Sequence, residues 1–286
     1  MTRSHKTDLS LLAVSAVWGS SFTLVKISLD DASPFLFLTI RFFLATLVLI
    51  PWALSERRHR PAARMFPGIL VGSLLFAGFA FQILGLQLVT PANSAFITGL
   101  SVVLVPIFLI PMRRRLPNPA SLLGVALATL GLFLLLREPG GMQLSRGNLF
   151  TLLCAFSFAF HIIGVDHFAR RQPYRHFTLI QLSTAGALAG IATLALEEPF
   201  IRPSGSLLLA LGVTSTLCTA GAYAVQTSMQ RYISPTRVAI IYATEPVFAA
   251  LFSALFYGER LGGSDILGGG LIFVGMLAAG LRKNSL

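Results

Sequence analysis

Apolar runs of about 20 residues recur along nearly the whole chain, and a helix of that length crosses the hydrocarbon core of a bilayer. Only 12% of the 286 residues are charged and 55% are hydrophobic, about half the charged fraction of an ordinary soluble domain. We therefore expect an all-α integral membrane protein embedded in the lipid bilayer. Ten spans are predicted, at residues 9–29, 34–54, 66–88, 91–111, 120–136, 148–168, 177–196, 207–230, 238–257 and 265–281.

The charges between these runs are unevenly divided. If the N-terminus is cytoplasmic, sixteen of the 22 lysines and arginines fall at cytoplasmic ends and four in outer loops. The outer loops instead hold acidic residues such as Asp30, Asp31, Glu197 and Glu198. This is the positive-inside pattern. It predicts a multi-pass protein of the plasma (inner) membrane with both termini cytoplasmic. It also accounts for the net charge of +11 without a nucleic-acid partner.

The sequence resembles itself at a shift of 144 residues. Gln82 falls on Gln226, Pro91 on Pro235 and Gly124 on Gly268. We therefore divide the chain into a first repeat at 1–140 and a second at 141–286, with five spans each. Because five is odd, the second repeat is expected to enter the membrane inverted. Inverted repeats are typical of secondary transporters, which bind substrate near the midplane between the halves. We expect that cavity between the first, third, fourth, sixth, eighth and ninth spans.

Four stretches resemble a known family. They are AVWGSSFTLVK at 16–26, IRFFLA at 40–45, TEPVFAALFSALFYGERL at 244–261 and LGGGLIFVG at 267–275. Together they resemble the EamA-type ten-helix transporters of the drug/metabolite transporter superfamily, over the whole chain. The resemblance implies export of small metabolites such as amino acids, and in some members of toxic compounds.

Two mechanisms of that superfamily do not carry over to this chain. The first span lacks the membrane glutamate that the small four-helix multidrug members use for proton coupling. The sugar-phosphate and nucleotide-sugar relatives place lysines in their central cavity. Here Lys26, near the outer end of the first span, is expected to reach the interface instead. A phosphate-bearing substrate is therefore disfavoured.

Ionisable residues within the spans are functional candidates, because each costs at least about 2.5 kcal/mol at mid-depth. Glu245 precedes Pro246, which removes a backbone donor and interrupts a helix. Interrupted backbone is tolerated only where it is buried or lines a wet cavity. We predict a gating or coupling role for this pair, with Arg41 as a candidate partner of the carboxylate. His161 either bonds to a neighbouring helix or titrates and contacts substrate from the cavity.

Two repeat-related pairs suggest how a substrate binds. Phe79 and Gln82 are spaced i,i+3, as are Tyr223 and Gln226, so each pair lies on one helix face. An aromatic ring with an amide suits a zwitterionic or amide-bearing solute; the alternative for the glutamines is hydrogen bonding between helices. The predicted substrate-binding residues are Trp18, Phe79, Gln82, Phe96, Phe160, His161, Tyr223, Gln226 and Tyr242.

Enzymatic signatures are weak in this chain. There is no GxxxxGK[ST] motif and no Cys/His pattern for a metal. His161 and Asp166 match the HxxxxD spacing of acyltransferases, but both lie in an apolar run. No catalytic residue, metal or cofactor is predicted. The sequence favours alternating-access export of small metabolites, amino acids first. The alternatives are proton-coupled efflux of cationic or aromatic drugs through Glu245 and, less favoured, an intramembrane enzyme or lipid-handling protein.

Overall fold

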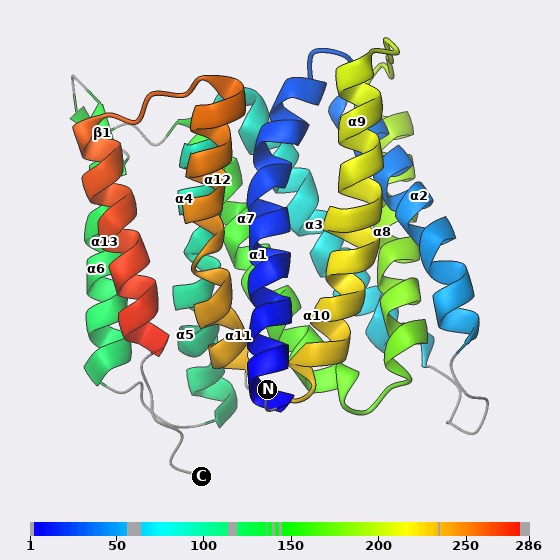
Figure 1. Cartoon of the computed structure of the whole chain (residues 1–286), viewed down its shortest axis with the longest axis horizontal. Coiled ribbons are helices and arrows are strands. Elements are labelled where there is room, and N and C mark those ends of the chain that lie inside the picture. The colour runs from blue at the N-terminus through cyan, green and yellow to red at the C-terminus, as the bar shows by residue number, and fades with distance from the viewer. Residues whose placement is uncertain are drawn as a thin grey trace.

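The computed structural model describes residues 3–55, 64–113, 119–135, 137–138, 141–142, 145–233 and 235–280. These residues form a bundle of helices that run across the molecule between two faces (Figure 1). The one sheet within the described ranges is a small antiparallel hairpin of β1 (Arg137–Glu138) and β2 (Gly141–Met142). The apolar pattern of the sequence did not predict this hairpin.

The described residues of the first half form six helices. They are α1 (Arg3–Ser28), α2 (Pro34–Leu54), α3 (Met65–Leu88), α4 (Pro91–Gly99), α5 (Ser101–Arg113) and α6 (Pro119–Leu135). The second half follows the hairpin and includes two π-helical segments, η1 and η2. Its elements are α7 (Arg146–Ala169), α8 (Tyr174–Leu196), α9 (Gly205–Val213), η1 (Thr214–Gly221), α10 (Ala222–Gln230), α11 (Pro235–Tyr242), α12 (Glu245–Phe252), η2 (Ser253–Tyr257) and α13 (Gly263–Gly280).

Several of these helices are long and apolar enough to cross a membrane. In the described part of the chain seven stretches meet that length and composition: Lys6–Ser28, Pro34–Leu54, Met65–Leu88, Pro91–Ile110, Arg146–Ala169, Tyr174–Leu196 and Gly205–Gln230. Two shorter apolar helices, Glu245–Tyr257 and Gly263–Gly275, accompany them. The protein is therefore a multi-pass membrane protein. The number of spans predicted from the sequence, ten, stays a prediction.

Two of the predicted spans are interrupted near their middle. One changes from α4 to α5 at Leu100, and the other from α11 to α12 at Ala243 and Thr244. The second break follows from Pro246, which lies in the first turn of α12 and has no N–H to continue the ladder from α11. The sequence prediction of a broken helix at Glu245-Pro246 is confirmed. The first break has no proline at its start and was not predicted.

The helices of the two halves correspond at the same shift of 144 residues. Pro91 begins α4 and Pro235 begins α11, while Ser101 begins α5 and Glu245 begins α12. In Figure 1, α1 begins and α13 ends at the lower face, whereas the hairpin that precedes α7 lies at the upper face. The chain thus starts its second set of helices from the face opposite to the first.

Corresponding helices α6 and α13 lie side by side at one edge of the bundle (Figure 1). Glycines let their backbones touch. A Cβ built on Gly131 lies 2.5 Å from the carbonyl oxygen of Gly268, and one built on Gly275 lies 2.6 Å from that of Gly124. Real Cβ atoms do not approach so closely, so this pair of helices depends on glycine at both crossings.

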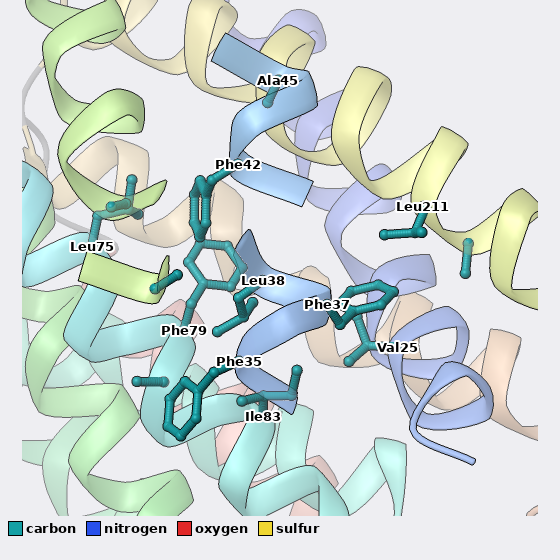
Figure 2. Packing of buried hydrophobic residues seen from close by; sticks show 14 of the residues in the cluster. Val25, Phe35, Phe37, Leu38, Phe42, Ala45, Leu75, Phe79, Ile83 and Leu211 are labelled. Carbon is teal, nitrogen blue, oxygen red and sulfur yellow. The ribbon is translucent and has the colours of Figure 1, made fainter. Parts of the chain in front are cut away.

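The largest buried cluster draws on both halves. Phe35, Leu38 and Phe42 of α2 meet Phe79 of α3, as Figure 2 shows. The rings of Phe42 and Phe79 are edge to face with centroids 5.2 Å apart. Leu182, Leu207 and Tyr223 from the second half join the same cluster. The two halves therefore share this cluster.

Polar contacts tie the halves together at both faces. At the upper face a bridge pairs Ala32 with Ile201, and the Glu197 carboxylate accepts from the N–H groups of Phe35 and Leu36 at 3.1 and 2.8 Å. A carboxylate at the first turn of α2 satisfies N–H groups that the helix leaves unpaired. Near the start of α1, the Arg237 guanidinium donates to both oxygens of Asp8, at 3.1 and 2.5 Å.

Candidate binding site

A cavity lies between the two halves, at the two helix breaks. The cavity volume open to water-sized molecules is about 50 Å³. Its walls come from α1, α3, α4, α5, α7, α10, α11 and α12, which are the spans between which the sequence predicted a cavity. The lining residues are Trp18, Ser21, Phe79, Gln82, Thr98, Gly99, Ser101, Val102, Phe158, His161, Ile162, Tyr223, Gln226, Tyr242 and Glu245.

Most of the lining comes from equivalent positions of the two halves. The pairs stand 144 residues apart and face one space: Trp18 with Ile162, Phe79 with Tyr223, Gln82 with Gln226, Thr98 with Tyr242, and Ser101 with Glu245. A cavity built this way lies where the two repeats meet. The side chains within a pair differ, so the two walls are not chemically alike.

The break before α12 places Glu245 in the cavity wall. Glu245 is the first residue of α12, and Thr244 links the break to α1 through a 2.9 Å hydrogen bond with Ser15. Gly19 of α1 packs directly on this turn, since a Cβ there lies 2.6 Å from the Cβ of Phe248. Glu245 is half-buried, and the ion pairs Arg170–Asp166 and Arg237–Asp8 do not involve it. It is the one acidic side chain among the described residues that line the cavity.

Three aromatic side chains form one wall of the cavity. The indole of Trp18 lies 5.3 Å from the ring of Tyr223 and 4.9 Å from that of Tyr242, centroid to centroid. Its Nε1–H donates to the Cys218 carbonyl oxygen at 2.7 Å. That hydrogen bond fixes the orientation of the indole, because a buried Trp N–H needs a partner.

His161 lines the cavity and is also bonded to a neighbouring helix. Its Nε2 lies 3.1 Å from Oε1 of Gln181 on α8. Since that oxygen only accepts, Nε2 carries the proton of the neutral ring. The Gln181 amide in turn donates to the Phe177 carbonyl oxygen at 3.3 Å. The alternative of a histidine bonded to a neighbouring helix is therefore confirmed, and one side of the ring lies at the cavity. Titration or substrate contact by His161 stays a prediction.

The two glutamines of the repeat differ in their bonding. Gln226 donates to Oε1 of Gln230 at 3.3 Å, and Gln230 donates to the Ile162 carbonyl oxygen at 2.7 Å. The Oε1 atom of Gln226 is buried and has no partner. Gln82 is buried in the cavity wall, and no hydrogen bond ties its side chain to the described residues. Gln226 is therefore held by a network, whereas the Gln82 amide remains available.

Two predicted binding residues lie outside the cavity. Phe96 packs against α13, where its ring lies 2.5 Å from a Cβ built on Gly269, and it lines a separate hollow beside Glu259 and Asp265. Phe160 is 45% exposed on the outer side of α7 and stacks on Phe108 with centroids 4.5 Å apart. The structure does not bring these two side chains to the other predicted residues.

Arg41 does not pair with Glu245, so the prediction that Arg41 is the partner of this carboxylate is wrong. Its Nε donates to the Thr219 hydroxyl of η1 at 2.7 Å, and its guanidinium carbon lies 4.5 Å from the ring centre of Phe79. The two remaining guanidinium nitrogens are buried without a partner. Phe79 lines the cavity, whereas Arg41 lies in the core beside Phe79. Pro246 is buried at the helix break and does not line the cavity.

The structure adds lining residues that the sequence did not single out. Ser21 and Phe158 follow Trp18 and precede His161 on the same faces of α1 and α7, at a spacing of three. Thr98 and Ser101 flank the break between α4 and α5. The shift of 144 residues relates these two to Tyr242 and Glu245, and that relation could have identified them from the sequence. Within the described residues, no group of three or more His, Cys, Asp or Glu side chains lies together as a metal site does.

Known proteins resemble this chain over nearly its whole length. A protein of Archaeoglobus fulgidus named uncharacterized transporter is 31% identical over 96% of this chain and 86% of its own length. A probable amino-acid metabolite efflux pump of Escherichia coli is 25% identical over 96% of this chain and 94% of its own. The Escherichia coli protein named uncharacterized inner membrane transporter YedA is 24% identical over 96% and 90%.

A solved crystal structure shares the fold. Its TM-score is 0.73 at 24% sequence identity, and the match covers 98% of both chains. The model of the EamA-like transporter family matches twice in succession, at residues 5–137 and 145–281, which indicates a duplicated repeat. The family consists of transporters and not of enzymes. This chain therefore belongs to the EamA-like transporter family of the drug/metabolite transporter superfamily.

Proposed function

We propose that this protein is a secondary transporter that exports small metabolites, with amino acids as the favoured cargo. The single observation that carries the proposal is the cavity lined by equivalent residues of both halves, such as Phe79 with Tyr223 and Gln82 with Gln226. A site at the junction of two repeats can open to either face when one half rocks against the other.

The membrane topology is inferred from the same repeat. We infer ten crossings in two inverted sets of five, an inner-membrane location and cytoplasmic termini. The correspondence of helix bounds, with α4 and α11 both starting at a proline, supports the duplication. The ends of α1 and α13 at one face support an even number of crossings (Figure 1). The basic residues at that face support its cytoplasmic orientation.

The two broken spans supply the moving parts. Interrupted helices tolerate changes in backbone angle, because fewer hydrogen bonds connect the two pieces. In α11 and α12 the break carries Glu245 at its cavity side, with Pro246 fixing the turn. We infer that Glu245 links the occupancy of the cavity to the position of α12, as a gate or as a proton carrier.

The choice of cargo rests on the walls of the cavity and on one relative. Aromatic rings, two amides and one carboxylate suit an amphipathic solute with an amino group. The Escherichia coli relative named as a probable amino-acid metabolite efflux pump agrees with that reading. Proton-coupled efflux of cationic or aromatic compounds is the second candidate, and the carboxylate of Glu245 in the cavity favours it.

Uptake into proteoliposomes tests the function. The purified protein is reconstituted, and a panel of labelled amino acids is offered with and without a pH gradient. Protein-dependent uptake of at least one amino acid is expected, and stimulation by the gradient identifies proton coupling. If none of the 20 common amino acids enters above empty liposomes while an aromatic amine does, the second candidate replaces the first.

A further inference from the structure

We propose that Glu245, Trp18, Tyr223 and Tyr242 form a binding site for an ammonium group on one wall of the cavity. The proposal rests on the transport function proposed above and names the part of the cargo that the cavity recognises. The cargo class is an organic ammonium ion, whether or not it also carries a carboxylate.

The three rings provide a surface suited to a cation. Trp18 contacts both Tyr223 and Tyr242, at centroid distances of 5.3 and 4.9 Å, and these planes are inclined by 47° and 64°. An ammonium ion over the face of a Trp or Tyr ring is attracted by the ring quadrupole. All three residues line the same cavity as Glu245.

The unpartnered polar atoms of this wall are oxygens, each of which can accept a hydrogen bond. The Gln226 Oε1 and the Tyr242 hydroxyl are buried without partners, and the Glu245 carboxylate lines the cavity beside them. An ammonium group has three donors and no acceptor. It can therefore satisfy groups that the folded chain leaves unpaired, and buried unpaired polar groups are costly.

The donors of the same wall are already engaged. The Trp18 indole N–H bonds to the Cys218 carbonyl oxygen and the His161 Nε2–H to Gln181. The Gln226 amide bonds to Gln230, and the Ser21 hydroxyl to the Trp18 carbonyl oxygen at 2.7 Å. Because these donors are bonded while the Gln226 and Tyr242 oxygens are unpaired, this wall favours a cationic donor over an anion.

No cation of the described chain occupies this position. Arg41, the buried guanidinium nearest to the cavity, bonds to Thr219 and lies over Phe79 instead of approaching Glu245. Lys26 bonds to carbonyl oxygens at the end of α3. The Glu245 carboxylate is therefore left for a cation that comes from outside the chain.

The cavity has one ammonium site, because the two halves differ at the positions that form it. The position equivalent to Glu245 is Ser101, and the position equivalent to Tyr242 is Thr98. Ile162 stands where the other half has Trp18. The opposite wall thus has neither the carboxylate nor the indole, so one ammonium group binds per molecule and always on the same side of the cavity.

Trp18 is a built-in reporter for the test. The protein has two tryptophans, and the other, Trp52, packs on Tyr174 near the end of α2, outside the cavity. The Trp52→Phe variant leaves Trp18 as the single indole. Its fluorescence is followed in detergent while phenethylammonium is added, and separately while the neutral isostere 2-phenylethanol is added. Saturable quenching is expected, with the ammonium compound binding about tenfold or more tightly.

Variants in the same background assign the effect to the site. Glu245→Gln is expected to weaken phenethylammonium binding by about tenfold or more and to leave 2-phenylethanol unchanged. Glu198→Gln, which removes an exposed carboxylate outside the cavity, is expected to change neither. Tyr242→Phe keeps the ring and deletes the unpaired hydroxyl. Tyr242→Phe is expected to lower the affinity for phenethylammonium by a few fold. This variant therefore tests the site even if Glu245→Gln elutes as an aggregate.

The outcomes separate this site from the transport function. Equal affinity for the two ligands, or ammonium binding that survives both Glu245→Gln and Tyr242→Phe unchanged, overturns the ammonium site. Ammonium binding that depends on Glu245, together with no uptake of any compound by proteoliposomes, supports the site and refutes the proposed transport.

Discussion

Lys26 and Arg170 stand 144 residues apart and cap equivalent helix ends at opposite faces of the molecule. The Lys26 Nζ donates to the carbonyl oxygens of Leu86 at 2.5 Å and Val89 at 3.1 Å, where α3 ends. The Arg170 Nη2 donates to the carbonyl oxygen of Ile233 at 3.0 Å, just beyond α10. Val89 and Ile233 are themselves equivalent positions. The repeat thus extends to a basic side chain that donates to carbonyl oxygens at, or just beyond, the end of the corresponding helix in each half.

Removing the charge of Lys26 is expected to lower stability. Lys26→Met leaves the end of α3 without its donor, and a charged hydrogen bond to a helix end contributes about 1–2 kcal/mol. The melting temperature of the detergent-solubilised protein should fall. Arg170→Met should lower it less, because the Arg170 side chain is 48% exposed. Equal melting temperatures for Lys26→Met and for Lys6→Met, which alters an exposed lysine of the same helix, contradict the capping role.

The crossing of α6 and α13 is expected to reject a side chain. Gly131→Ala and Gly275→Ala place a Cβ 2.5 and 2.6 Å, respectively, from a backbone carbonyl oxygen of the other helix. Overpacking of this kind costs about 1–3 kcal/mol. Gly270→Ala is the matched control, because nothing lies within 4 Å of its Cβ position on α13. In thermal melts the melting temperature of Gly270→Ala should equal or exceed that of the parent protein. If Gly270→Ala is as unstable as Gly131→Ala and Gly275→Ala, the packing explanation is wrong.

The two glutamines are expected to respond differently to truncation. Gln226→Ala removes the donor to Gln230 inside a buried network, so stability should fall by about 1–3 kcal/mol. Gln82→Ala breaks no hydrogen bond with the described residues, so the yield of folded protein should hold while the ranking of transported substrates changes. Competition in the uptake assay measures that ranking. Unchanged ranking with unchanged yield for Gln82→Ala removes Gln82 from the binding site.

Glu245→Gln is expected to lower transport by about tenfold or more while the protein stays monodisperse. The amide has nearly the same shape as the carboxylate, but it carries no charge and cannot exchange a proton. Initial uptake rates in proteoliposomes, compared with those of Glu198→Gln, measure the effect. Wild-type rates in a monodisperse Glu245→Gln protein refute both gating and coupling by this residue.

Much of the fold was predictable because a membrane span is defined by length and apolar composition. The predicted run at 66–88 matches α3 (Met65–Leu88) to one residue at its start. The break at Pro246 was predictable from the missing N–H. The break at Leu100 has no such chemical mark, and the hairpin at 137–142 is too short to leave a pattern in the sequence.

The cavity was partly predictable for a related reason. Polar and amphipathic residues such as Gln82, His161, Tyr223 and Glu245 stand out against an apolar background, and they line the cavity. Phe96 and Phe160 do not stand out, because phenylalanine suits lipid, core and cavity equally well. The partner of Arg41 depends on the packing of α2 against η1, where a π-helix places Thr219. Spacing along the chain contains no information on that contact.

Cysteine labelling of the cavity tests the central claim, that this space opens to each face of the membrane in turn. The two native cysteines, Cys154 and Cys218, are buried and are replaced by alanine, and Ser101→Cys places one thiol in the cavity. A membrane-impermeant maleimide is then applied to vesicles of either orientation. We expect labelling from both faces, slowed by a transported substrate, whereas Glu198→Cys reacts from one face alone. Labelling of Ser101→Cys from a single face, at a rate that no transported substrate alters, contradicts the central claim.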